Sequence, residues 1–110
     1  MAITVTSRHF KAHPSLVEYA EQAVEGLGRY YDGIIKGEVI LEFERTHNSV
    51  KIAEVNLSVF NAKLTATHQS DDFFKSIDGA MEKMASQLKK YKDKLHSKDR
   101  DAVRKVREKE

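Results

Sequence analysis

The sequence has no cysteine, one proline and no long apolar run among its 110 residues. Without cysteine the chain has no disulfides, thiolate metal ligands or cysteine nucleophile, which suits a reducing compartment. No segment approaches the roughly 20 apolar residues that cross a bilayer, and the N-terminus MAITVTSRHF lacks the basic and apolar regions of a signal peptide. These absences predict a soluble cytoplasmic protein that is stabilised by packing alone.

Catalytic motifs are also missing. There is no GxSxG motif, Walker loop or GxGxxG fingerprint, so hydrolase, phosphate-loop and dinucleotide chemistry is not indicated. His9 and His13 have a spacing that suits metal ligation on a helix, but Pro14 and the change from strand to helix deny them one. We therefore predict a protein that is not an enzyme and has no metal site or cofactor.

Length and composition predict one domain, because 110 residues with 40% hydrophobic content can bury a single modest core. The spacing of the apolar residues predicts that this domain is of the α+β class. Residues 3–7 alternate as in a strand, and apolar residues then recur at helical spacing from Ser15 to Tyr31. Gly33, at positive φ, is expected to end that helix. Three further strands are expected at residues 38–44, 54–60 and 63–67.

Short links at residues 46–49 and at Asn61-Ala62 predict an antiparallel meander of these three strands, whereas the helical connection places the first strand parallel to the second. A last helix begins at Asp71-Asp72, so the order is β-α-β-β-β-α. We expect a two-layer domain with a four-stranded mixed sheet and both helices on one face, as in double-stranded-RNA-binding domains. The other face would expose strand glutamates and threonines.

The last helix has the most regular apolar periodicity in the chain, with a stripe expected to centre on Met81 and Leu88. The stripe comprises Phe74, Ile77, Met81, Met84, Leu88, Tyr91 and Leu95. At about 100° per residue, lysines at positions 83, 90 and 94 lie within about 40° of one another on the opposite face, and lysines at 89 and 92 flank them. Either a solvated helix face near a favourable dipole end or a phosphate-binding surface explains these lysines.

Residues 76–95, SIDGAMEKMASQLKKYKDKL, closely resemble the second helix of the bacterial hibernation-promoting factor and ribosome-associated inhibitor family, the sigma-54 modulation protein family. The N-terminal ITVTSRHF, the segment LGRYYD at residues 27–32 and the order of elements are also similar to this family. The resemblance covers about residues 2–96. It predicts a ribosome-binding domain at residues 1–96 and a charged tail at 97–110, either flexible or a helical extension.

The resemblance implies a stress or stationary-phase factor that binds the small ribosomal subunit between head and body, over the mRNA channel and the A- and P-site tRNA positions. It would act by occupancy, inhibiting translation without chemistry. The expected contacts to ribosomal RNA come from Arg29, Lys83, Lys89, Lys90, Lys92 and Lys94. The chain would be a short form without the C-terminal domain of long members, and its tail leaves open whether it promotes or opposes ribosome dimers.

Two other binding functions stay open from the residues. A free-standing double-stranded RNA binder would use the same fold and recognise phosphate spacing by shape. A protein-interaction module would instead present the glutamate face of the second strand to a basic partner, with the lysines merely solvating the helix. That face carries Glu38, Glu42 and Glu44.

Overall fold

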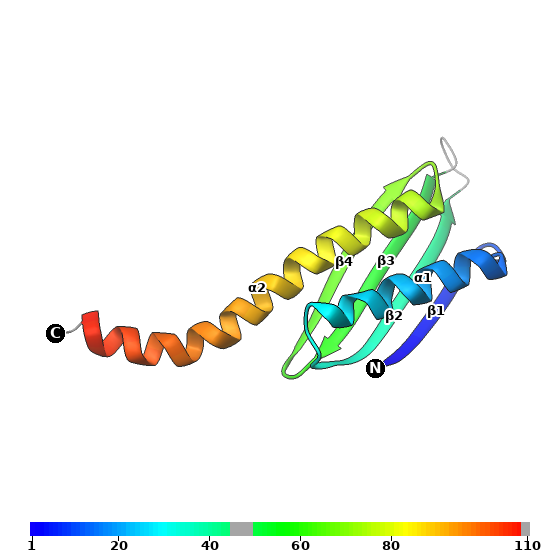
Figure 1. The fold of residues 1–110 in the computed structure, drawn as a ribbon. Coiled ribbons are helices and arrows are strands. Elements are labelled where there is room, and N and C mark those ends of the chain that lie inside the picture. The colour runs from blue at the N-terminus through cyan, green and yellow to red at the C-terminus, as the bar shows by residue number, and fades with distance from the viewer. Residues whose placement is uncertain (45–49, 109–110) are drawn as a thin grey trace.

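The computed structural model describes the backbone of residues 1–44 and 50–108 and the side chains of residues 1–44 and 50–94 (Figure 1). A 3-10 helix, η1, follows the first α-helix directly. In chain order the elements are β1 (Ala2–Arg8), α1 (Pro14–Gly26), η1 (Leu27–Arg29), β2 (Ile34–Glu44), β3 (Val50–Val59), β4 (Ala62–Ser70) and α2 (Phe73–Glu108).

The four strands form one mixed sheet in the order β1-β2-β3-β4. β1 runs parallel to β2, with Val5 beside Val39, and β2, β3 and β4 are antiparallel neighbours, with Val55 between Val39 and Ala66. These pairings confirm the predicted meander and the predicted parallel first pair. The short β3–β4 link permits only an antiparallel hairpin, whereas α1 carries the chain back along the sheet, so that β2 runs parallel to β1. β1 and β4 are the two edge strands.

Both helices lie side by side on one face of the sheet, as predicted (Figure 1). The core lies between them and the inward-facing strand residues, among which Val39, Leu41, Val55 and Leu57 are fully buried. The alternating burial of β3 shows the two-faced character of the sheet, because every second residue from Ala53 to Val59 is buried. The polar residues between them face away from the helices.

α1 begins and ends differently from the prediction. It starts at Pro14, and His13 caps it, because the His13 imidazole accepts a hydrogen bond of 3.1 Å from the backbone N–H of Ser15. The α-helix ends at Gly26 and tightens into η1, since glycine is a poor helix former. The predicted positive φ at Gly33 is wrong, since no described glycine has one. Gly33 instead lies under the Tyr31 ring, where a Cβ would be only 2.4 Å from ring atoms.

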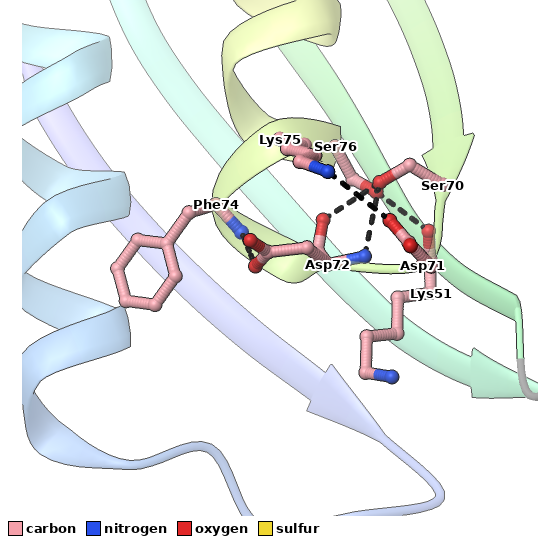
Figure 2. A network of polar contacts seen from close by, with 7 residues as sticks. All are labelled: Lys51, Ser70, Asp71, Asp72, Phe74, Lys75 and Ser76. Atoms are coloured by element: carbon pink, nitrogen blue, oxygen red, sulfur yellow. Dashed lines mark hydrogen bonds and ion pairs between the residues drawn. The ribbon is translucent and has the colours of Figure 1, made fainter.

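The start of α2 is held by a polar network (Figure 2). The Asp72 carboxylate accepts a 2.9 Å hydrogen bond from the Phe74 N–H, so Asp72 is the expected N-terminal cap. The Ser76 side chain is fully buried and donates to the Lys51 carbonyl of β3 at 2.7 Å. It also lies 2.7 Å from the Ser70 hydroxyl at the end of β4. The network thereby joins the first turn of α2 to two strands.

The buried stripe of α2 is rotated from its predicted position. Phe73, not Phe74, enters the core; Phe74 is 41% exposed and stacks edge-on against Tyr19 of α1. Met81 is only partly buried, so the predicted centre is wrong at Met81, whereas Ile77, Met84 and Leu88 are fully buried as predicted. The residues of α2 that the structure buries are Phe73, Ser76, Ile77, Ala80, Met84 and Leu88. Periodicity alone does not decide which side of a broad stripe faces a sheet and which faces a neighbouring helix.

The β3–β4 turn consists of Phe60 and Asn61, one residue earlier than predicted, and Asn61 has φ of 61°. Asparagine tolerates this left-handed conformation better than most residues. The other predicted turn, at residues 46–49, lies outside the described residues.

Candidate functional site

Four of the six predicted RNA-binding residues, Lys89, Lys90, Lys92 and Lys94, lie along α2 as the helix passes the end of the sheet. The hydroxyl of Tyr91, within this segment, donates to the Phe60 carbonyl in the β3–β4 turn. All four lysines are exposed, and within the described part of the chain none has a hydrogen bond or an ion pair. Their ammonium groups are therefore available to an anionic partner.

Lys83 lies in a different environment from these four lysines. Its Nζ donates a 2.8 Å hydrogen bond to the Thr67 carbonyl of the edge strand β4, and one turn later the Gln87 amide donates to the Thr65 carbonyl at 2.7 Å. Lys83 thus lies on the β4 flank of α2 rather than opposite the buried stripe. The two side chains cover backbone carbonyls that an edge strand otherwise leaves unpaired.

Arg29 is exposed in η1, on the other flank of α2, and has no ion pair with any described residue. It lines a groove of about 560 Å³ between the end of α1 and the middle of α2. Lys89 follows the groove residue Ala85 by one helical turn, and residues four apart lie on the same side of a helix. The fold therefore brings Arg29 towards the lysine-bearing part of α2, although Arg29 and Lys89 are 60 residues apart in sequence.

Tyrosine side chains contact α2 from α1 and from the link after η1. The Tyr19 hydroxyl donates to the Asp78 carboxylate, and this hydrogen bond, more than burial, raises the pKa of Tyr19 above 10.0. The rings of Tyr31 and Tyr91 meet edge-on, with centroids 5.6 Å apart. The groove lining combines apolar side chains with charged ones. The groove lining comprises Ala23, Gly26, Leu27, Arg29, Tyr30, Asp78, Met81, Glu82 and Ala85.

The described residues contain no group of three His, Asp or Glu side chains arranged to hold a metal ion. His9, considered above as a ligand, lies 3.6 Å from the Glu42 carboxylate, and the His13 ring caps α1. None of the described helices is long and apolar enough to span a membrane.

Residues 3–96 match the model of the family described as Sigma 54 modulation protein / S30EA ribosomal protein. The chain belongs to this family. The S30EA family comprises ribosome-associated factors rather than enzymes, as the sequence predicted. The match includes Arg29 and all five lysines of α2 named above, but it does not test their individual roles.

Relatives named ribosome hibernation promoting factor support this assignment. The Escherichia coli K12 protein is 31% identical over 96 residues, which cover 86% of this chain and 97% of the relative. The Klebsiella oxytoca protein is 28% identical over 95 residues, with the same coverage.

Two solved structures are similar to the S30EA fold seen here. A ribosomal subunit interface protein from Coxiella burnetii has a TM-score of 0.76 and 28% identity, over 84% of this chain and 99% of the other. The N-terminal domain of Protein Y from Thermus thermophilus has a TM-score of 0.73 at 22% identity, over 83% and 99% of the two chains. The second similarity concerns the fold alone.

Sequence reasoning missed the groove and the role of Lys83. The groove lining comes from α1, η1 and α2, so no single periodic pattern contains it. An available signal was the set of small residues, Ala23 and Gly26 on α1 with Ala85 on α2, which recur where bulky core residues would otherwise join two helices.

Proposed function

We propose that this protein is a cytoplasmic ribosome hibernation factor that binds the small ribosomal subunit between head and body. There it occludes the mRNA channel and the A- and P-site tRNA positions under stress or in stationary phase. Membership of the S30EA family supports the ribosome as its partner, and the names of its relatives support hibernation as the outcome.

The observation that carries this proposal is a row of lysines along α2, Lys89, Lys90, Lys92 and Lys94, whose ammonium groups are exposed and have no partner among the described residues. At about 100° per residue, Lys90 and Lys94 share one side of the helix and Lys89 and Lys92 another. Lysines bind phosphate oxygens without reading base sequence, so such a row suits the backbone of folded ribosomal RNA. Arg29 adds a cation across the groove, and Lys83 retains further N–H donors beside its bond to Thr67. Binding then needs no chemical step, because the bulk of the domain excludes tRNA and mRNA.

Co-sedimentation with ribosomes, isolated small subunits and naked duplex RNA, at two salt concentrations, tests the proposal. Binding to ribosomes and small subunits that weakens with salt, without comparable binding to duplex RNA, is the expected result. Tight binding to naked duplex RNA would favour a free-standing RNA binder. Ribosome binding that is absent at both salt concentrations would refute the proposal and favour a protein partner for the face of β2 that carries Glu38, Glu42 and Glu44.

A matched pair of double variants tests the lysine row. K90E/K94E reverses two exposed charges on α2, whereas K36E/K63E reverses two exposed charges on the open sheet face, beside Ser58. Both variants change the net charge equally. We expect K90E/K94E to abolish ribosome binding and K36E/K63E to retain it, with the thermal midpoints of both near the wild-type value. Equal loss in the two variants would show a general charge effect and would contradict the role of the lysine row.

Milder neutral substitutions give a quantitative check. Each phosphate contact contributes about 0.7–0.9 to the slope of log binding constant against log salt concentration. Lys90→Gln combined with Lys94→Gln should therefore reduce this slope by about 1.4–1.8 if both lysines contact phosphates. The functional division between residues 1–96 and 97–110 stays a prediction, although α2 continues as a helix to Glu108.

A further inference from the structure

The groove between α1 and α2 has a partly apolar floor and polar groups on its rim. Ala23, Leu27, Met81 and Ala85 provide the apolar surface. The volume of about 560 Å³ is within the range of roughly 300–1,000 Å³ that is usual for small-ligand sites. The groove is bordered by two ring contacts to α2, one from Tyr19 of α1 to Phe74 and one from Tyr31, in the link after η1, to Tyr91.

Three rim side chains are unpaired within the described part of the chain. Tyr30 is 53% exposed, an unusual position for a large aromatic ring, and its hydroxyl has no hydrogen bond. Arg29, its neighbour in η1, has no carboxylate partner, although Glu82 lines the same groove. The Glu82 carboxylate is likewise free, whereas one oxygen of Asp78 is already bound by Tyr19.

This combination matches the parts of a nucleotide. Unpaired bases stack on aromatic rings and on arginine, and their edges are read by hydrogen bonds. A phosphate would pair with Arg29, and a base would lie against Tyr30 and the apolar floor. The Glu82 carboxylate has no proton to donate, so it can only accept hydrogen bonds from the edge of the base. Guanine presents a ring N–H and an amino group side by side, so one carboxylate can accept from both. Uracil has a single ring N–H that lies between two carbonyl oxygens. The carboxylate repels these two oxygens, so it binds uracil less well than guanine.

We propose that the groove between α1 and α2 binds one unpaired guanine nucleotide of RNA, with Glu82 accepting from the base and Arg29 binding the phosphate. The inference rests on the proposed RNA-binding function, because the adjacent lysine row would bring single-stranded RNA to the groove. It adds a base-selective contact to a surface whose lysines are indifferent to sequence. The carboxylates of Asp78 and Glu82 could instead pair with an arginine side chain of a protein partner.

The test is a titration of the isotope-labelled full chain with guanosine 5′-monophosphate and with uridine 5′-monophosphate, followed by NMR. The guanine nucleotide should shift the methyl signals of Ala23, Met81 and Ala85. It should also bind at least about tenfold more tightly than the uridine nucleotide, which corresponds to a difference of about 1.4 kcal/mol in binding free energy. Equal affinities, or no shifts at millimolar nucleotide, would overturn the proposal. Tighter binding of N-acetyl-arginine amide than of the guanine nucleotide would replace the nucleotide by a protein segment.

Three variants make the site assignment specific. Ala85→Leu fills the groove, while Ser86→Leu adds the same side chain at the next, exposed position outside the lining. We expect the first to weaken guanine nucleotide binding at least about tenfold and the second to leave it unchanged. Glu82→Gln should reduce the preference for guanine over uridine to about twofold or less, since an amide presents a donor as well as an acceptor. Equal effects of the two leucine variants would refute the groove as the site.

The titration contains no ribosomes, so its failure and the failure of the proposed function are distinguishable. If the protein binds ribosomes but no nucleotide, only the proposal of a nucleotide site in the groove is refuted. If it binds the nucleotide but no ribosomes, the nucleotide site is supported and the proposed hibernation function is refuted.

Discussion

The close approach of α2 to β4 at Gly79 gives a prediction with a worked magnitude. A Cβ at Gly79 would lie 2.3 Å from Cδ2 and 2.4 Å from Cγ of His68, which sits half-buried on the inner face of β4. Because the contacts are with the ring rather than with the far end of a flexible chain, either the ring or the helix must move. Gly79→Ala therefore introduces an overpacked contact beneath the helix that carries the lysine row.

Two opposing terms set the size of the effect. Overpacking costs about 1–3 kcal/mol, while replacing glycine by alanine within a helix gains about 1 kcal/mol. The expected net loss for Gly79→Ala is about 1 kcal/mol, which lowers the thermal midpoint by roughly 4–5 °C in a domain of this size. Gly26→Ala is the matched control, because nothing lies within 4 Å of a Cβ there. It should instead stabilise the protein by about 0.5–1 kcal/mol.

A double-mutant cycle with His68→Ala isolates the contact. Without the imidazole ring the overpacking is relieved, so Gly79→Ala should become stabilising by about 1 kcal/mol in that background. The coupling free energy between the two positions is then about 2 kcal/mol. Thermal or urea unfolding followed by circular dichroism measures all four proteins. If Gly79→Ala stabilises the wild-type chain as much as Gly26→Ala does, the close contact is absent and the reasoning is wrong.

Two further predictions concern buried and paired hydroxyls. Ser76→Ala removes the donor to the Lys51 carbonyl and leaves the Ser70 hydroxyl with one partner fewer, so urea unfolding should show a loss of about 1–3 kcal/mol; an unchanged midpoint would mean that water replaces the hydroxyl. Since the pKa of Tyr19 is raised in the folded state, mainly by its hydrogen bond to Asp78, the unfolded chain releases this proton first as pH rises past 10.0. Stability should therefore fall above that pH, and Tyr19→Phe should show a smaller fall between pH 9 and 11; equal falls would contradict the assignment.

Local pattern was enough for most of the fold, because strands and helices bury residues with different periods. The alternation at residues 54–60 and the three- and four-residue steps of α2 identify these elements without tertiary information. Short links then fix the antiparallel neighbours, and Asp72 marks the start of α2 by its capping side chain. The row of lysines at residues 89–94 was also apparent, since it belongs to a single helix.

Tertiary structure decided what depends on two elements meeting. Phe73 and Phe74 are adjacent and chemically identical, and only the position of the sheet makes one core and the other a contact to α1. Lys83 reads as one more solvent-exposed lysine until β4 places the Thr67 carbonyl within 2.8 Å of it. The groove beside Tyr30 exists only because α1, η1 and α2 pack next to one another. The sequence by itself determined the elements and their charges, whereas distances across element boundaries arise only when the chain packs.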